Sequence, residues 1–111
     1  MRVFITGASS GIGEALAVYY AGQGATLGLC ARRRDALEQL NAKLGGQHAI
    51  YALDVANASA LATAAADFIA RFGVPDIVIA NAGISAGTLT EYAEDLEVIK
   101  RIFDTNVFGM A

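Results

Sequence analysis

The chain has 111 residues, of which 55% are hydrophobic and 17% charged, and its formal net charge is −3. These values fit a single domain and exclude a disordered chain, and the acidic balance argues against a general nucleic-acid binder. One Cys and one His exclude a disulfide scaffold and a Cys- or His-rich metal site. Because no run of about 18 apolar residues and no signal-peptide layout occur, we expect a cytoplasmic protein without a membrane partner.

The first half of the chain alternates short apolar runs with helical patterns. An apolar run over residues 3–5 is followed by a predicted helix over residues 11–24. One face of that helix is predicted from apolar residues at i, i+3, i+4 and i+7, which are Ile12, Ala15, Leu16 and Tyr19. A second apolar run covers residues 25–30. A second helix is predicted over residues 34–44, with an apolar face of Leu37, Leu40 and Leu44.

The second half repeats this alternation. Apolar runs cover residues 48–53 and 76–80, and helices are predicted over residues 57–72 and 91–103. Strands that alternate with helices favour an α/β fold with a parallel sheet and helices on both faces. The strand runs are continuously apolar, as expected when both faces of the sheet are covered.

A glycine-rich loop lies between the first strand and the first helix. It reads Thr6-Gly7-Ala8-Ser9-Ser10-Gly11-Ile12-Gly13, which gives the spacing G-x-x-x-G-x-G. This is neither a P-loop, which needs G-K-[ST], nor the G-x-G-x-x-G fingerprint. The physics is shared, because glycines let the backbone approach a phosphate and the free N–H groups of the helix start face the anion. The loop therefore predicts a nucleotide site.

Three further motifs follow this loop in a fixed order. They are Leu53-Asp54-Val55, Asn81-Ala82-Gly83 and Thr105-Asn106-Val107. Together with the glycine loop they span the chain, which resembles the short-chain dehydrogenase/reductase family. The resemblance implies a Rossmann-type, doubly wound parallel sheet with about four strands in the order 3-2-1-4. It also implies an oxidoreductase that moves hydride between NAD(H) or NADP(H) and a small carbonyl or alcohol substrate.

The resemblance also implies roles for individual residues around the cofactor. The pyrophosphate turn and the residues that line it are Gly7, Ser9, Ser10, Gly11, Ile12 and Gly13. Asp54 and Val55 are expected beside the adenine ring, where the carboxylate accepts from the amino group. Asn81, Ala82 and Gly83 are expected to line the floor near the ribose on the nicotinamide side.

The end of the second strand bears on the choice of cofactor. An NAD site usually places a carboxylate there for the ribose 2′-hydroxyl, but here Arg32, Arg33 and Arg34 precede Asp35. Guanidinium groups suit phosphate oxygens, so we expect NADP(H) to be preferred over NAD(H). Arg32 and Arg33 are the expected contacts and Arg34 the solvent-facing residue. On this hypothesis Arg32→Asp moves the preference toward NAD(H).

The catalytic pair of the family is missing from these residues. Its Tyr-x-x-x-Lys motif cannot be formed, because the two lysines, Lys43 and Lys100, follow Gln39 and Leu96 at that spacing. Asn106 matches the asparagine that helps to hold the catalytic lysine through water. Residues 1–111 are thus expected to form an NAD(P)-binding domain that is incomplete at its C-terminal end and inactive alone. Two alternatives remain open: a non-catalytic dinucleotide-binding module, and an interaction module that pairs with another chain through the exposed edge of the fourth strand and the last helix. Association into a homo-oligomer also remains open.

The remaining single residues have plain structural interpretations. Cys30 is expected in the core, His48 at the exposed end of a strand in solvent, and Tyr19 against a helix face. The acidic side chains of residues 91–97 complement a helix dipole. We therefore expect no metal site.

Overall fold

The computed structural model describes residues 1–9 and 11–81, in which strands and helices alternate. The elements are β1 (Arg2–Thr6), α1 (Gly11–Gly22), β2 (Thr26–Ala31), α2 (Arg34–Lys43), β3 (Ala49–Ala52), α3 (Ala58–Phe72) and β4 (Ile77–Ala80). Every element expected before residue 81 is present. The helix expected over residues 91–103 lies outside the described residues. No described helix is both long and apolar enough to span a membrane.

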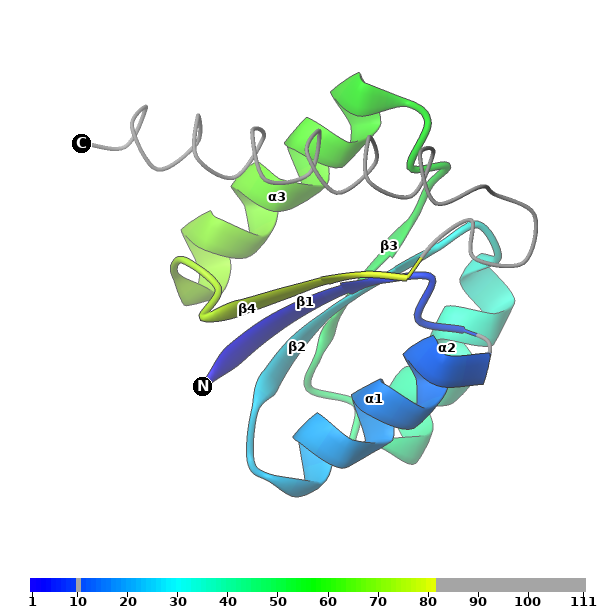
Figure 1. The fold of residues 1–111 in the computed structure, drawn as a ribbon, viewed down its shortest axis with the longest axis vertical. Coiled ribbons are helices and arrows are strands. Elements are labelled where there is room, and N and C mark those ends of the chain that lie inside the picture. The colour runs from blue at the N-terminus through cyan, green and yellow to red at the C-terminus, as the bar shows by residue number, and fades with distance from the viewer. Residues whose placement is uncertain (10, 82–111) are drawn as a thin grey trace.

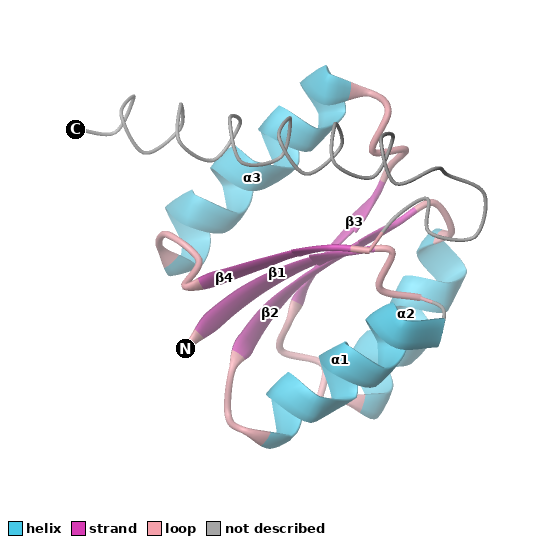
Figure 2. Cartoon of the chain, viewed as in Figure 1, coloured by secondary structure: helices cyan, strands magenta, loops and turns pink. Residues whose placement is uncertain are grey.

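The strands form one parallel sheet in the order β3-β2-β1-β4, which confirms the expected Rossmann-type topology. Helices α1 and α2 cover one face of this sheet, and α3 covers the other (Figures 1 and 2). The chain proceeds outward from β1 through β2 to β3, and then returns to the opposite side of β1 for β4. The reversal of strand order lies between β1 and β4, the place where doubly wound sheets bind ligands.

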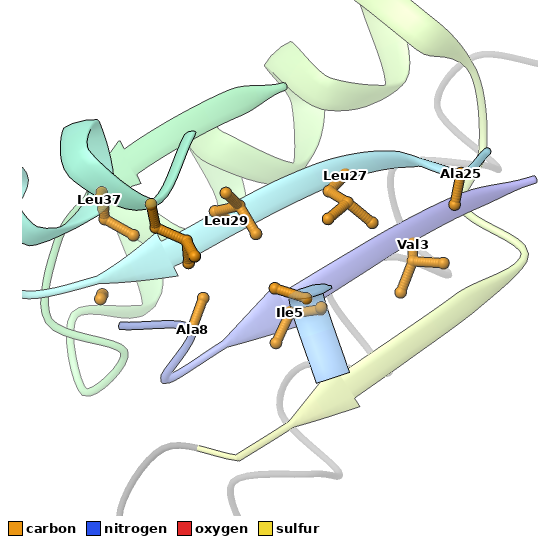
Figure 3. Close-up of a cluster of buried hydrophobic side chains, with 10 residues drawn as sticks. Val3, Ile5, Ala8, Ala25, Leu27, Leu29 and Leu37 are labelled. Carbon is orange, nitrogen blue, oxygen red and sulfur yellow. The ribbon is translucent and has the colours of Figure 1, made fainter. Parts of the chain in front are cut away.

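Two buried clusters explain why the strands are apolar on both faces. Successive side chains of a strand point to opposite faces of the sheet. Val3, Ile5, Leu27 and Leu29 therefore pack toward α1 and α2 (Figure 3). Phe4, on the other face, joins the cluster under α3. Each face of the sheet thus has its own core.

Helix α1 packs through a different face from the one predicted. Ile12 is 63% exposed and Tyr19 is 59% exposed. The buried residues of this helix are Gly13 and Ala17, and Leu16 is partly buried against the cluster that contains Ala17. Small residues let the helix backbone approach the sheet, so the larger apolar side chains at Ile12 and Tyr19 face outward. The predicted packing of Tyr19 against a helix face was wrong.

Helices α2 and α3 follow their predictions closely. Leu37 and Leu40 of α2 are buried as expected. Helix α3 begins after Asn57, whose Oδ1 accepts a hydrogen bond from the Ala60 backbone N–H at 3.0 Å. An Asn at this position satisfies one of the free N–H groups at the start of a helix. At the other end, Gly73 adopts φ 105°, a conformation that favours glycine.

Two single-residue expectations had opposite outcomes. Cys30 is fully buried as expected, and burial raises the pKa of its thiol to about 12. His48, expected in solvent, is only 5% exposed. Its Nδ1 accepts a hydrogen bond from the backbone N–H of Leu27 at 3.1 Å. The imidazole, directly before the start of β3, thus satisfies a backbone N–H of β2. The short apolar pattern around His48 does not reveal this contact.

Candidate functional site

The sequence motifs converge at one edge of the sheet. Because all four strands are parallel, their carboxyl ends lie at the same edge. The glycine loop follows β1, Arg32 and Arg33 follow β2, Asp54 follows β3, and Asn81 follows β4. Residues from four separate chain segments are therefore available to a single ligand.

The loop after β1 depends on glycine for two different reasons. Gly7 and Gly11 have φ of 67° and 52°, the left-handed region that other residues rarely adopt. Gly13 is required by space instead. A Cβ at Gly13 would overlap the Gly7 carbonyl oxygen and approach the Asn81 Nδ2 atom to 2.6 Å. The first turn of α1 therefore lies directly against the loop.

Asn81 joins this loop to the end of β4. Its Nδ2 donates to the Gly7 carbonyl oxygen at 3.2 Å, and its backbone N–H donates to Thr6 Oγ1 at 3.1 Å. Thr6 Oγ1 in turn donates to the Ile79 carbonyl at 3.4 Å. Thr6 is fully buried, so this hydroxyl is shielded from competing water. These bonds fix the glycine turn against β4 at the reversal of strand order.

A second anchor joins the loop to β2. The Ala8 backbone N–H donates to the Cys30 carbonyl at 3.1 Å, and the Ala8 side chain is fully buried. Ser9 is partly buried beside it. The loop backbone is thus held from both sides before the chain enters α1. The N–H groups at the start of a helix favour a bound anion in this position.

The arginines after β2 are engaged by carboxylates. Arg32 Nη2 lies 3.5 Å from Asp54 Oδ2, which brings together the segments that follow β2 and β3. Arg33 Nη2 donates to Asp35 Oδ2 at 2.8 Å. Arg34 pairs along α2 with Glu38 at 3.8 Å. All three guanidinium groups are largely exposed, so a ligand in solution can reach them.

Asp54 also shapes the turn between β3 and α3. Its Oδ1 accepts from the Ala56 backbone N–H at 2.9 Å, and its carbonyl accepts from the Asn57 N–H at 2.9 Å. Val55 is partly buried against the core under α3. The Asp54 carboxylate is therefore held by its own turn on one oxygen and by Arg32 on the other.

Some predicted site residues are brought together and others cannot be placed. Gly7, Gly13 and Asn81 are in mutual contact, and Arg32 meets Asp54. Residues expected in the site but outside the described part of the chain are Ser10, Ala82, Gly83 and Asn106. Residues 1–9 and 11–81 hold no group of three or more His, Cys, Asp or Glu side chains that could bind a metal.

Two residues that shape the candidate site, Thr6 and Asp35, were not assigned a role there from the sequence. Thr6 was included in the glycine motif, but its hydrogen bonds to the β4 segment were not foreseen. A buried threonine at a strand end beside a glycine turn is the available signal, because its hydroxyl needs a partner. Asp35 was treated as a helix residue, although it holds Arg33. An acidic residue two positions after an arginine at a helix start could have suggested this pair.

Comparisons with known proteins agree on one family. The family description "short chain dehydrogenase" matches residues 1–111. The chain is 38% identical to dehydrogenase/reductase SDR family member 7B of Bos taurus over 96% of its length, but spans only 35% of that relative. It is 33% identical to the 2-dehydro-3-deoxy-L-rhamnonate dehydrogenase (NAD(+)) of a Sphingomonas strain, covering 96% of this chain and 42% of the relative.

A solved structure supports the same assignment. The alcohol dehydrogenase of the archaeon Thermococcus sibiricus, complexed with 5-hydroxy-NADP, superimposes with a TM-score of 0.79 at 30% identity. The match covers 96% of this chain and 52% of that protein. The chain thus spans about a third to a half of the length of these proteins. With the sheet order, the glycine turn and the matched family in agreement, the chain belongs to the short-chain dehydrogenases, a family of oxidoreductases that bind nicotinamide dinucleotides.

Proposed function

We propose that this chain supplies the cofactor-binding part of an NADP(H)-dependent oxidoreductase that acts on a small carbonyl or alcohol substrate. The observation that carries the proposal is the convergence of a glycine turn and an arginine cluster at one edge of the sheet. The turn is closed by Gly13, Gly7 and Asn81. Arg32 and Arg33 follow the neighbouring strand β2. When bound, the nicotinamide supplies or accepts the hydride.

The pyrophosphate is assigned to the loop after β1. Its N–H groups and the start of α1 offer donors and a positive dipole end to the two phosphates. The absence of a side chain at Gly13 keeps the first helical turn close to Gly7. The residues assigned to this part of the cofactor are Gly7, Ser9, Ser10, Gly11, Ile12 and Gly13.

The two nucleoside halves are assigned to the ends of β3 and β4. Asp54 and Val55 are proposed at the adenine, with the Asp54 carboxylate as the acceptor for its amino group. Because Asp54 also pairs with Arg32, this carboxylate links the adenine position to the ribose position. Asn81, Ala82 and Gly83 are proposed beside the nicotinamide ribose. Asn106 is proposed to help to hold the catalytic lysine of the family through water.

The preference for NADP(H) is proposed from charge. No carboxylate occurs between the end of β2 and Asp35, whereas three consecutive arginines do. A 2′-phosphate gains charge-assisted hydrogen bonds from such side chains, each worth about 1.5–3 kcal/mol and less where solvent screens it. The relatives include an NAD(+) enzyme and the structural neighbours an NADP complex, so the choice within the family rests on this chain's own residues.

The role proposed for these residues is cofactor binding and not catalysis. The 111 residues contain no Tyr-x-x-x-Lys motif. A tyrosine with a pKa near 10 needs a cationic neighbour to transfer protons near neutral pH. We therefore propose that these residues bind the cofactor and do not reduce a carbonyl compound alone, which a NADPH-oxidation assay with varied carbonyl compounds tests directly.

Arg32→Asp tests the cofactor assignment against a matched control. Calorimetric titration with NADPH and NADH gives the ratio of the two dissociation constants for each variant. We expect Arg32→Asp to reduce the preference for NADPH about tenfold, because a cation is replaced by an anion at the 2′-phosphate. Arg34→Asp makes the same charge change and should leave the ratio within about twofold. An unchanged ratio in Arg32→Asp would overturn the proposed role.

A further inference from the structure

Asp35 holds one of the two arginines that the proposed function assigns to the 2′-phosphate. Arg33 Nη2 donates to Asp35 Oδ2 at 2.8 Å, the shortest of the three pairs formed by Arg32, Arg33 and Arg34. Arg33 is the N-cap of α2, with φ −97° and ψ 110°, and Asp35 lies in the first turn of that helix. The pair therefore lies at the entrance of α2, directly after the end of β2.

Both members of this pair are charged and accessible. The Arg33 and Asp35 side chains are 74% and 62% exposed. The hydrogen bond from Arg33 lowers the pKa of the Asp35 carboxyl below its usual value. A carboxylate in the first turn is also favoured by the helix dipole, whereas the cation beside it is not. Asp35 thus remains ionised and offsets an unfavourable charge at Arg33.

We propose that Asp35 is a specificity-determining residue that acts as an internal counterion for Arg33 and limits the preference for NADP(H). This inference rests on the proposed function. Asp35 accepts a hydrogen bond from the Arg33 guanidinium, the group proposed to bind a 2′-phosphate. A dinucleotide with a 2′-phosphate must displace or share this carboxylate, whereas one without the phosphate need not. Asp35 therefore weakens the binding of NADP(H) selectively.

The Arg34–Glu38 pair provides a control within the same helix. Its members are 3.8 Å apart at positions i and i+4, and they are also largely exposed. Glu38→Gln removes one negative charge, as does Asp35→Asn. A general effect of net charge on anion binding appears in both variants, whereas release of Arg33 appears only in Asp35→Asn.

Two adenosine nucleotides test the inference without the nicotinamide half. Adenosine 2′,5′-bisphosphate and 5′-AMP differ only in the 2′-phosphate, so the ratio of their dissociation constants isolates its contribution. We expect Asp35→Asn to increase the preference for the bisphosphate about three- to fivefold relative to Glu38→Gln, the scale of an exposed ion pair. Circular dichroism of each variant establishes that the fold is retained.

A double-mutant cycle separates a contact with Arg33 from general repulsion. In an Arg33→Gln background, Asp35→Asn should no longer change the preference by more than Glu38→Gln does. Persistence of the full effect in that background would overturn the counterion role, as would equal effects of Asp35→Asn and Glu38→Gln in the parent chain.

The outcomes also distinguish this inference from the proposed function. A parent chain that binds the bisphosphate no better than 5′-AMP contradicts the proposed NADP(H) preference, and the role of Asp35 fails with it. A parent chain that prefers the bisphosphate, with an unaltered preference in Asp35→Asn, contradicts the role of Asp35 alone. If Asp35→Asn lowers only the thermal stability, Asp35 serves the helix start and not cofactor choice.

Discussion

His48 is the single histidine of the chain; it is buried, and its Nε2 has no hydrogen-bond partner among the described residues. Its Nδ1 accepts from the Leu27 N–H at 3.1 Å. Its own backbone N–H donates to Asn41 Oδ1 at 3.1 Å, and its carbonyl accepts from Asn41 Nδ2 at 3.2 Å. Burial lowers the pKa of the imidazole, an effect partly offset by the Leu44 backbone. Protonation of His48 Nδ1 would also place two N–H donors opposite each other and break the hydrogen bond from Leu27.

The lowered pKa predicts a loss of stability in mild acid. In the unfolded chain His48 takes up its proton near pH 6.5, whereas in the folded chain its pKa is lower. The contribution of neutral His48 to stability is therefore fully present above about pH 6.5. This contribution is lost as the pH decreases through the pKa of the folded state. We expect the free energy of unfolding, measured by urea denaturation, to decrease between pH 7.5 and pH 5 through His48.

His48→Asn separates this titration from other acid effects. The Asn side chain retains an oxygen that can accept from the Leu27 N–H, but it does not titrate in this range. We expect the variant to show a flatter dependence of unfolding free energy on pH, whatever its stability at pH 7.5. Parallel pH profiles for the parent chain and the variant would contradict the assignment.

The roles of individual residues could be predicted where they depend on the spacing of residues close by in the chain. Gly7 and Gly11 follow from the motif, because their positive φ angles serve a turn within their own few residues. The motif also includes Gly13, but its requirement for glycine comes from its close approach to Gly7 and Asn81. His48 was not predictable in this way, since its partner Leu27 is 21 residues earlier in the chain. Polar contacts across strands depend on register, which a local pattern does not contain.

At the scale of elements, α1 shows where apolar periodicity misleads. The pattern of large residues selected a face containing Ile12 and Tyr19, yet the buried residues are Gly13, which lies against the loop after β1, and Ala17, which joins the core on this side of the sheet. Both sets have helical spacing, so periodicity alone does not choose between them. The choice depends on how closely the helix approaches the sheet. In α3, by contrast, large apolar residues such as Leu61 and Phe68, which share one helical face, are buried.

Gly28 shows the same close approach on the other face of the sheet. It lies in β2 under α3, where the rings of Phe4 and Phe68 meet edge to face with centroids 5.6 Å apart. A Cβ at Gly28 would lie 2.7 Å from a carbon of each ring. We expect Gly28→Ala to lower the free energy of unfolding in urea by about 1–3 kcal/mol through overpacking.

Two further variants test that explanation. In a Phe68→Leu background, which makes room above the strand, the cost of Gly28→Ala should decrease. Gly22→Ala is the matched control, because a Cβ built there has no described atom within 4 Å apart from its chain neighbours and the backbone of its own helix. We expect it to change stability by less than about 1 kcal/mol. An unchanged cost in the Phe68→Leu background would show that the two sites are independent and the overpacking explanation wrong.

At the scale of the whole molecule, the sheet order was predictable because the family resemblance supplied it. Apolar runs alone predict that strands exist and are covered, but they do not determine which strands are neighbours. In the structure the chain first builds the sheet outward from β1 through β2 to β3, and then places β4 on the opposite side of β1. Thr6 of β1 contributes through bonds to Ile79 and to Asn81, which is 75 residues away in the chain.

Because the buried Thr6 hydroxyl joins β1 to β4 and to Asn81, we expect it to affect both the stability of the sheet and the binding of the cofactor. Thr6→Val keeps the shape of the side chain but removes the hydroxyl that accepts from the Asn81 N–H and donates to the Ile79 carbonyl. Loss of a buried partner costs about 1–3 kcal/mol, so we expect a decrease of that size in the free energy of unfolding. We also expect weaker binding of adenosine 2′,5′-bisphosphate, because Asn81 positions Gly7 through its Nδ2.

Thr6→Ser provides the control, since it retains the hydroxyl and removes only a methyl group. Amide hydrogen exchange followed by NMR gives a local measurement that loss of packing does not reproduce. We expect exchange at the Asn81 amide to be faster in Thr6→Val than in Thr6→Ser. Equal exchange in the two variants would mean that the hydroxyl does not hold β4 to β1, and that the Asn81 side chain and the bond from Ala8 to Cys30 position the glycine turn without it.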